Sequence, residues 1–356
     1  MFPSWPHHAS ATVADIGEHA IIRWIRDAAA CLPPAAGVIA GIGDDAAVVA
    51  PVRNHVDVLT TDIQVEDVHF TWAFSTPSAI GARALHVNLS DLAAMGATPR
   101  LALLSLGLPA SLTGTRLHGV LEGLLDAARK ARVTLVGGNV SRAPTMVLDV
   151  TLTGSVKARH VLRRDRARPG DEIYVSGDLG GAAAGLAWLR AGDARLNAES
   201  ADAARASALD RYRTPVARVA LGIQVARNRA ASACMDTSDG LADALQQIAA
   251  GSGVGMRVDK AALPLHPAVP AAAALTGTDP WWLALAGGED YELVFTVPRR
   301  VRRAFHHATS RRGLPGVTRI GVCTREPGLV LVDADGTEAS LPAGHEHFRG
   351  GGADDA

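Results

Sequence analysis

A strand, a glycine-rich turn and a helix follow one another twice in the second half of the chain, and this order limits the available folds. The first instance is EIYVSGDLGGAAAGLAWLRAG (172–192), and the second is ACMDTSDGLADALQQIAAGSG (233–253). A third glycine turn, in LAGGEDYELVFTVP (285–298), leads from a helix into a strand. Interleaved strands and helices pack as layers on a sheet, so the pattern predicts an α/β or α+β fold rather than an all-α or all-β one.

The first half of the chain interleaves helices and strands in the same way. Apolar residues at helical spacing predict an amphipathic helix over 13–31, which Pro33 and Pro34 terminate. The alternating segment HVDVLTTD (55–62) predicts a strand that ends at Asp62. The other elements predicted here are helices over 78–97 and 115–131, followed by strands in VTLVGG (133–138) and TMVLDVTLTGSV (145–156).

The length of the chain predicts two domains. A single hydrophobic core stops growing at about 250–300 residues, whereas this chain has 356. The connector 157–171 is dense in arginine and closes with Pro-Gly, so it is the predicted inter-domain segment. We therefore expect one domain over 13–156, a second over 157–348 and a disordered tail over 349–356.

Composition argues against several classes of partner. The formal net charge is -1 and the chain has only three lysines, so no broad basic surface is available for nucleic acid or an acidic membrane. No signal-peptide pattern opens the sequence, and no apolar run reaches the ~18 residues of a membrane span. Three scattered cysteines (Cys31, Cys234 and Cys323) fit neither a disulfide framework nor a zinc site. We expect a soluble cytoplasmic protein that is not exported.

Carboxylates gather at glycine turns and strand ends. The turn GIGDDAAVV (41–49) carries Asp44 and Asp45, although acids repel the phosphates that glycine turns commonly approach. Asp91 interrupts an apolar helix, where its carboxylate either bonds nearby backbone and water or faces a ligand. Asn88 lies one turn earlier on the same face of the helix, which favours the interpretation that Asp91 faces a ligand. Hard oxygens from several segments are the ligands that Mg²⁺ or Ca²⁺ prefers, so a cation between acids and phosphate would explain the pattern.

The motif MDTSDGLADAL (235–245) has a structural and a functional interpretation. Ser238 or Asp239 is a natural cap for the helix that begins near Leu241. Capping does not explain Asp236 at the preceding strand end, and a helix N-terminus beside two acids also suits a metal-bridged phosphate. Familiar alternatives are missing from the sequence: it has no Walker A motif, no protein-kinase catalytic loop, no dinucleotide fingerprint after a strand and no nucleophile elbow.

Seven stretches, in family order, resemble the thiamine-monophosphate kinases. That family shares a superfamily with aminoimidazole ribonucleotide synthetase, selenophosphate synthetase and a hydrogenase-maturation protein. The matching stretches are GIGDDAAVV, TTDIQVEDVHF, ALHVNLSDLAAMGATP, LVGGNVSRAP, VLRRDRARPGD, MDTSDGLADAL and GGEDYELVFTVP. The resemblance implies a two-domain fold like that of aminoimidazole ribonucleotide synthetase, with an N-terminal ATP- and Mg-binding domain that forms a homodimer and a C-terminal α/β domain that completes the substrate site.

The resemblance also implies a reaction and the residues that perform it. ATP would phosphorylate thiamine monophosphate directly to thiamine diphosphate, assisted by several Mg²⁺ ions and without a covalent enzyme intermediate. The implied catalytic residues are Asp62, Asp91 and Asp236, and the implied substrate contacts are His69 and Glu289. The implied metal ligands are Asp45, Thr60, Thr61, Asp62, Asp91, Asp236 and Asp239, and the implied ATP contacts are Gly138, Asn139, Arg164 and Ser238.

Two departures from the family pattern leave alternatives open. Asn139 replaces the usual acid after the second glycine, and Pro342 and Ala343 stand where the family tends to place an aromatic residue that stacks on thiamine. One alternative is a Mg-nucleotide-binding homologue without turnover. The other is a sister ATP-dependent synthetase, although the chain has no reactive cysteine near its start and none at its end.

Overall fold

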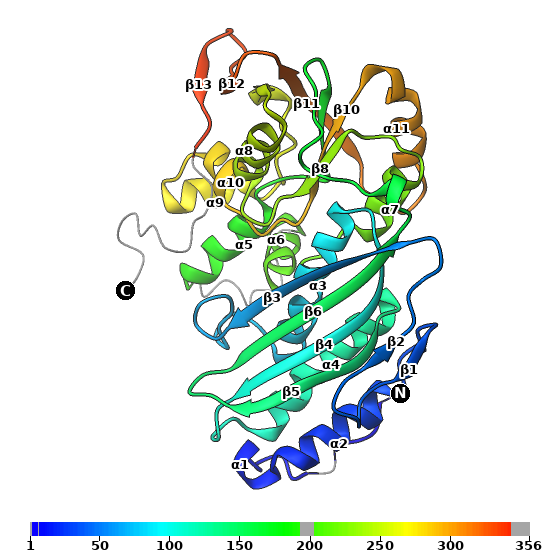
Figure 1. Ribbon diagram of the computed structural model, residues 1–356. Coiled ribbons are helices and arrows are strands. Elements are labelled where there is room, and N and C mark those ends of the chain that lie inside the picture. Colours follow the sequence, from blue (N-terminus) through cyan, green and yellow to red (C-terminus); the bar gives the residue numbers. More distant parts are fainter. Residues whose placement is uncertain (1, 6, 193–202, 343–356) are drawn as a thin grey trace. The chain divides into compact units, whose positions relative to one another are not determined.

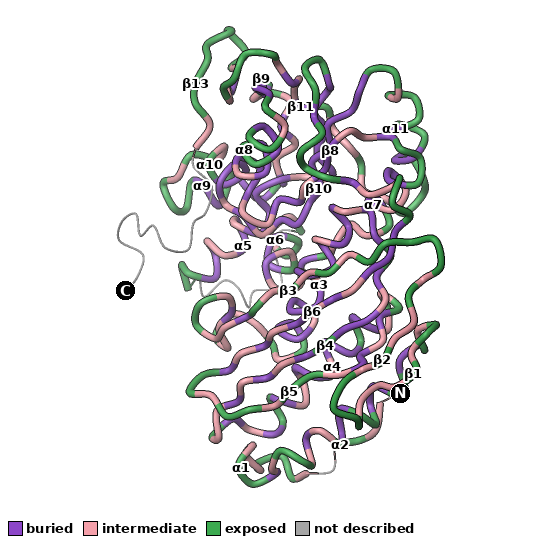
Figure 2. Tube along the Cα trace, viewed as in Figure 1, coloured by how far each residue is buried: buried purple, intermediate pink, exposed green. Residues whose placement is uncertain are grey.

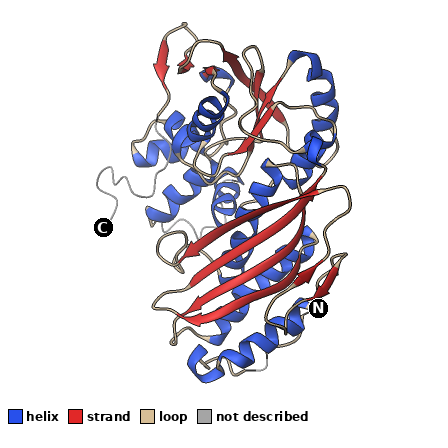
Figure 3. Ribbon diagram, viewed as in Figure 1, coloured by secondary structure: helices blue, strands red, loops and turns tan. Residues whose placement is uncertain are grey.

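The computed structural model describes residues 2–5, 7–192 and 203–342, which leaves the predicted tail 349–356 outside the described residues. The chain divides into two compact units, Met1–Val161 and Leu162–Ala356. The division thus falls after Val161, where the sequence predicted it after residue 156. Both units combine sheets with helices, which confirms the mixed fold class (Figure 3). No helix among the described residues is long and apolar enough to cross a membrane.

The N-terminal unit is built on a four-stranded sheet with two long helices against one face (Figure 1). The strand order is β3-β6-β4-β5; β4 and β5 are parallel and the other neighbours antiparallel. Thr76 and Thr113 cap the two helices through their side chains, each accepting a backbone N–H of the first turn. The elements are α1 (Val13–Ile16), α2 (Glu18–Ala29), β1 (Val38–Ala40), β2 (Val48–Val49), β3 (Val56–Val65), α3 (Pro77–Ala94), β4 (Thr98–Leu108), α4 (Gly114–Ala131), β5 (Thr134–Arg142) and β6 (Val147–Val156).

Three sequence-based predictions for this unit are corrected. The helix expected over 13–31 is broken at Gly17, whose φ of 78° does not continue a right-handed helix. The strand expected to end at Asp62 continues to Val65, because Ile63 and Val65 pair with β6. Strand β4 was missed altogether, although it lies inside the sheet between β5 and β6.

The two faces of this sheet differ in what covers them. Side chains alternate along a strand, so Thr60 and Asp62 point to the helix-covered face and Thr61 to the open face. The alternation of exposure along β3 is visible in Figure 2. On the open face Leu59, Ile63 and Leu103 are 67%, 48% and 40% exposed. The open face is therefore markedly apolar for a surface in contact with water.

The C-terminal unit is built on a seven-stranded mixed sheet in the order β13-β12-β9-β11-β7-β10-β8. Helix α8 packs on one face, where Ile173, Val175 and Val294 are fully buried. Phe305 of α11 contacts Tyr174 and Phe295 from the other face. The elements are β7 (Glu172–Ser176), α5 (Gly181–Arg190), α6 (Ala203–Arg213), α7 (Val219–Arg227), β8 (Ala233–Asp236), α8 (Leu241–Ser252), β9 (Gly255–Asp259), α9 (Val269–Thr276), α10 (Pro280–Ala286), β10 (Leu293–Val297), α11 (Arg302–Thr309), β11 (Val317–Thr324), β12 (Leu329–Val332) and β13 (Glu338–Ser340).

A histidine on α3 makes the stability of the N-terminal unit depend on pH. Burial, assisted by nearby Lys130, lowers the pKa of His86 to about 4. The unfolded chain therefore binds a proton that the folded chain does not bind between pH 6.5 and pH 4, and folding stability falls as the pH drops through this range, by at most about 3 kcal/mol. In urea titrations at pH 7.5 and 4.5, His86→Gln should lose less stability on acidification than the unsubstituted chain. The same change at exposed His55 is the control; an equal effect there would contradict the assignment.

Candidate functional site

The helix-covered face of β3 brings three of the predicted ligand residues together. Thr60 donates its hydroxyl hydrogen to a carboxylate oxygen of Asp91 on α3. Asp62 lies two residues further along the same face, and both carboxylates are partly exposed. Asn88 does not share this role: its side chain is fully buried and its amide donates to the backbone oxygen of Ala84, 3.1 Å away. Asn88 is therefore not exposed to a ligand here, although its Oδ1 is buried without a hydrogen-bond partner among the described residues.

The side chain of Thr61 lies on the opposite face of the sheet. Its hydroxyl donates to a carboxylate oxygen of Asp149 at 2.9 Å and contacts the hydroxyl of Thr151 at 3.0 Å. Because β3 alternates, the side chains of Thr60 and Thr61 cannot serve one site. A contact from Thr61 to an ion held by Asp62 would have to come from its backbone.

The glycine turn with Asp45 lies beside β5, the strand at the other edge of the sheet. The Cβ position of Gly41 is 3.7 Å from the backbone oxygen of Val136 in β5. In the turn, a carboxylate oxygen of Asp44 accepts the N–H of Asp45 at 2.9 Å, which agrees with a turn-shaping role for Asp44, while Asp45 is exposed. The carboxylate of Asp44 thus bonds within the turn, and Asp45 remains the predicted metal ligand of the pair.

Gly138 and Asn139 lie across the sheet from Asp62. The register aligns Asp62, Val150, Leu104 and Gly138 in one row, so three strand spacings, about 14 Å, separate Asp62 from Gly138. A single Mg²⁺ ion with ligands at ~2.1 Å cannot bridge them. Gly138 also has a packing role, since a Cβ there would lie 1.9 Å from the backbone oxygen of Leu104.

The loop after β3 orients the ring of His69. The N–H of Val65 donates to Nδ1 of His69 at 3.2 Å, so Nδ1 is the acceptor and Nε2 is the ring nitrogen that can donate. Glu66 ties the loop to the sheet: one carboxylate oxygen accepts the N–H of Met146 at 2.8 Å, and the other accepts the indole N–H of Trp72 at 2.5 Å. His69 is thereby a positioned hydrogen-bond donor. The sequence did not identify Glu66 as its support.

In the C-terminal unit, the end of β8 carries Asp236, which is buried. Helix α8 begins after Gly240, which caps it with φ 97° and no side-chain bond, so the predicted cap by Ser238 or Asp239 is wrong. Gly240 is required because a Cβ there would lie 2.7 Å from the backbone oxygen of Leu285. The hydroxyl of Ser238 instead approaches a carboxylate oxygen of Asp236, at 3.4 Å.

A third acid, which the sequence analysis did not single out, accompanies the β8 turn. Burial, followed by the charge of Asp239, raises the pKa of Asp243 in the first turn of α8. Asp239 precedes the helix, so no helical spacing links the two acids, and only the structure places Asp243 close to Asp239. Asp243 thus adds an oxygen donor near the predicted metal ligands.

The loop before β10 brings Glu289 against the β8 turn. The N–H of Glu289 donates to the backbone oxygen of Ser238 at 2.7 Å, so a predicted substrate contact and a predicted ATP contact are joined directly. Glu289 and Tyr291 have positive φ values of 61° and 50°. Strand β10 consequently begins at Leu293.

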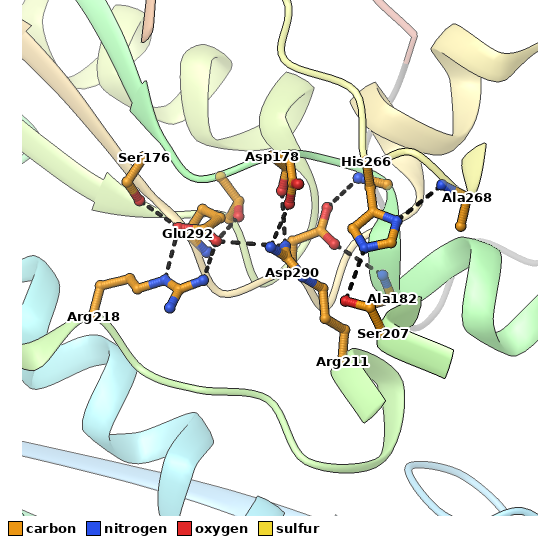
Figure 4. Close-up of polar contacts among 12 residues, drawn as sticks. Ser176, Asp178, Ala182, Ser207, Arg211, Arg218, His266, Ala268, Asp290 and Glu292 are labelled. Atoms are coloured by element: carbon orange, nitrogen blue, oxygen red, sulfur yellow. Dashed lines mark hydrogen bonds and ion pairs between the residues drawn. The ribbon is translucent and has the colours of Figure 1, made fainter. Parts of the chain in front are cut away.

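Behind this loop lies a buried polar network that the sequence did not reveal (Figure 4). The carboxylate of Asp290 accepts the N–H groups of Gly180 and Ala182, at 2.5 and 3.0 Å, at the start of α5. Burial raises the pKa of Asp290 to about 7, against the opposing effect of these two bonds. Burial lowers the pKa of Arg218, but bonds to Glu292 more than offset this, so the pKa of Arg218 lies above its usual value.

Arg164 is exposed, while its backbone is anchored within the C-terminal unit. Its carbonyl oxygen accepts the hydroxyl of Ser252 at the end of α8, at 3.0 Å. The carbonyl of the preceding Arg163 accepts the N–H of Cys234 in β8, at 3.1 Å. The guanidinium of Arg163 pairs with Asp165, which distinguishes it from Arg164. A planar guanidinium at this position suits phosphate oxygens.

The predicted metal ligands fit Mg²⁺ as small groups of acids. Among residues 2–5, 7–192 and 203–342, no three His, Cys, Asp or Glu side chains form a group that could hold a metal ion by itself. Mg²⁺ in proteins is commonly held by one or two carboxylates, with waters and substrate phosphates completing its octahedron. Asp62 and Asp91 beside Thr60, and Asp236 near Ser238, supply hard oxygens of this kind.

Two family models match the chain, and together they account for most of its length. They describe the N-terminal domain of AIR synthase related protein, over residues 43–156, and the C-terminal domain of AIR synthase related protein, over residues 168–334. Thiamine-monophosphate kinase of Bacillus subtilis (strain 168) is 34% identical over 314 residues, which cover 87% of this chain and 93% of the relative.

Solved structures show the same similarity. The crystal structure of thiamine-monophosphate kinase from Stenotrophomonas maltophilia K279a matches with a TM-score of 0.76 and 37% identity, covering 85% of this chain and 93% of that chain. A structure of AaThiL complexed with AMPPCP and TMP matches with a TM-score of 0.71 and 31% identity, covering 94% and 98%. With this identity over nearly the whole length of its relatives, the chain belongs to the thiamine-monophosphate kinase family of enzymes.

Proposed function

We propose that this chain transfers the γ-phosphoryl group of ATP directly to the phosphate of thiamine monophosphate, giving thiamine diphosphate and ADP. The observation that carries the proposal is the 2.7 Å backbone bond between Glu289 and Ser238, since it joins a predicted substrate contact to a predicted nucleotide contact. The AaThiL structure complexed with AMPPCP and TMP supports the same pair of ligands. An in-line transfer of this kind needs positioning and charge stabilisation rather than a nucleophilic side chain.

Each proposed role follows from the donors that the residue offers. Asp62, Asp91 and Asp236 are the proposed catalytic acids, and with Asp45, Thr60, the backbone of Thr61 and Asp239 they would hold Mg²⁺. When bound, the metal would neutralise phosphate charge in the ground state and during transfer. His69 offers Nε2–H to the substrate, and Arg164 offers a planar fork to ATP. On β5, Gly138 would contact the nucleotide through its backbone and Asn139 through its side-chain amide.

The direct test supplies purified protein with ATP, Mg²⁺ and thiamine monophosphate and measures thiamine diphosphate by chromatography. We expect equimolar thiamine diphosphate and ADP, and loss of both products when EDTA is added. ATP binding by calorimetry without thiamine diphosphate formation at saturating substrate would instead support a nucleotide-binding protein without turnover.

Asn139 provides a sharper test of the metal assignment. Asn139→Asp adds the charge that the family usually has here, and one more carboxylate near a divalent ion is worth about 1 kcal/mol, or about fivefold in affinity. We expect the Mg²⁺ concentration for half-maximal activity to fall by about this factor. Ser141→Asp is the matched control, because it adds the same charge two residues further along exposed β5. Equal shifts in both variants would mean that Asn139 has no special place at the metal.

We further propose that the chain forms a homodimer through the open face of the four-stranded sheet. Support comes from the exposed apolar side chains of Leu59, Ile63 and Leu103, which make this face suited to burial against a second copy. Light scattering on the purified protein should give twice the 36.9 kDa chain mass. A monomer at micromolar concentration would contradict the dimer while leaving the proposed reaction untouched.

A further inference from the structure

The end of β8 and the loop before β10 are joined by a reciprocal pair of hydrogen bonds. The N–H of Thr237 donates to the backbone oxygen of Glu292 at 2.9 Å, and the N–H of Glu292 donates to the hydroxyl of Thr237 at 3.0 Å. Both residues are buried, with exposed fractions of 1% and 0%. Thr237 stands between Asp236 and Ser238, so this pair lies directly beside the residues assigned to metal and ATP.

The side chain of Glu292 is turned into the C-terminal unit and is fully buried. Its carboxylate accepts the hydroxyl of Ser176 at 2.5 Å and Nε of Arg218 at 2.8 Å, and Arg211 approaches it at 3.5 Å (Figure 4). The hydroxyl of Ser176 also accepts the N–H of Leu293 at 2.9 Å. Arg218 and Arg211 compensate the charge of this carboxylate. Glu292 therefore has a fixed position that depends on Arg218.

The loop that these contacts anchor is strained. Gly288, Glu289 and Tyr291 have positive φ values of 65°, 61° and 50°. A non-glycine residue in this region costs about 1–3 kcal/mol and persists only where the surroundings enforce it. The Thr237–Glu292 bonds and the Glu289–Ser238 bond are contacts between the loop and the β8 turn that help to enforce it, and the bonds from Gly180 and Ala182 to Asp290 hold the middle of the loop to the start of α5. Without the first pair, the loop loses its support at Glu292, and the strain at Glu289 and Tyr291 can relax by moving Glu289 away from Ser238.

We propose that Thr237, Glu292 and Arg218 are positioning residues, which hold Glu289 against Ser238 without touching substrate. The proposal rests on the proposed function, because it concerns the geometry of the site assigned to thiamine monophosphate and ATP. Arg218 stands at the start of α7 and lies 74 residues from Glu292, so the helical part of the unit contributes to the site through this partly buried ion pair, beside a second one from Arg211 of α6. A displacement of about 1 Å at such a site can cost ~100-fold in rate.

Thr237→Val and Thr237→Ser form the first test. Valine keeps the shape of threonine but cannot accept the N–H of Glu292, whereas serine keeps the hydroxyl. For Thr237→Val we expect kcat/KM to fall ~10–100-fold. The KM for thiamine monophosphate should rise more than that for ATP, because Ser238 is still held between β8 and α8. Thr237→Ser should restore both parameters, and amide exchange at Glu289 and Glu292 should be faster in the valine variant alone.

Arg218→Lys is the second test, and it applies even if Thr237→Val does not fold. Lysine keeps the charge but cannot form the two-pronged contact with Glu292. We expect the same selective rise in the KM for thiamine monophosphate. Arg257→Lys is the matched control, because Arg257 forms an exposed pair with Glu338 in the same unit.

Three outcomes would overturn the positioning role: unchanged kinetics in folded Thr237→Val, an equal loss in Thr237→Ser, or an equal effect of Arg257→Lys. Failure of the proposed function is distinct, because the unsubstituted protein would then make no thiamine diphosphate. In that case amide exchange at Glu289 and Glu292, which needs no turnover, still decides whether Thr237 and Arg218 hold the loop.

Discussion

Asp91→Asn should lower kcat by at least about 100-fold while leaving the N-terminal unit folded. Asparagine has the same shape, and its Oδ1 can still accept the hydroxyl hydrogen of Thr60, so the contact between α3 and β3 survives. The negative charge is lost, and with it the attraction for a divalent cation that bridges two phosphate-bearing substrates. Steady-state formation of thiamine diphosphate measures the loss, and circular dichroism and thermal melting verify the fold. Raising Mg²⁺ should recover part of the rate.

Asp126→Asn is the control for this experiment. Asp126 is an acid on α4 in the same unit, and it forms an exposed pair with Arg129 at 2.9 Å. Its amide variant should turn over at the unsubstituted rate, because exposed pairs of this kind contribute little to stability. A near-normal rate in Asp91→Asn would mean that the carboxylate of Asp91 is not a metal ligand and that it only bonds Thr60.

Local chemistry made much of the fold predictable from the sequence. Helices α3 and α4 were expected from their apolar residues, and the structure adds that Thr76 and Thr113 cap them. Strand β4 was missed because a strand with neighbours on both sides has a nearly continuous apolar sequence, LALLSLGL, without alternation. The cap of α8 was assigned to the wrong residue because the choice of Gly240 depends on its distance to Leu285, which no local pattern contains.

The candidate site was predictable as residue types but not as an arrangement. Oxygen donors at glycine turns pointed to a cation, yet the alternation of β3 puts the side chains of Thr60 and Thr61 on opposite faces. The row from Asp62 to Gly138 crosses the whole sheet, which only the strand order reveals. Glu292 and Arg218 escaped notice because 74 residues separate them and neither belongs to a ligand motif. Contacts between distant segments decide such features.

Gly81→Ala should destabilise the N-terminal unit by at least about 3 kcal/mol, enough to unfold a marginally stable unit. A Cβ at Gly81 on α3 would lie 1.8 Å from the backbone oxygen of Val120 on α4. Gly123 on α4 has the reciprocal contact, since its Cβ would lie 2.0 Å from the backbone oxygen of Ser78. The obstacles are backbone atoms, which cannot turn aside as a side chain can, so the two helices would have to separate. Urea unfolding followed by circular dichroism measures the change.

Gly251→Ala separates this steric effect from helix propensity. Gly251 also lies within a helix, α8, but its Cβ would be 3.6 Å from the nearest atom, the Cβ of Asp165, an ordinary contact. Alanine is favoured over glycine within helices by about 0.5–1 kcal/mol, so this variant should be slightly more stable than the unsubstituted chain. Opposite signs for the same substitution at two helical glycines would identify the α3–α4 approach as the cause. A neutral or stabilising effect of Gly81→Ala would instead mean that α3 and α4 lie too far apart for a Cβ at residue 81 to clash with the backbone of Val120.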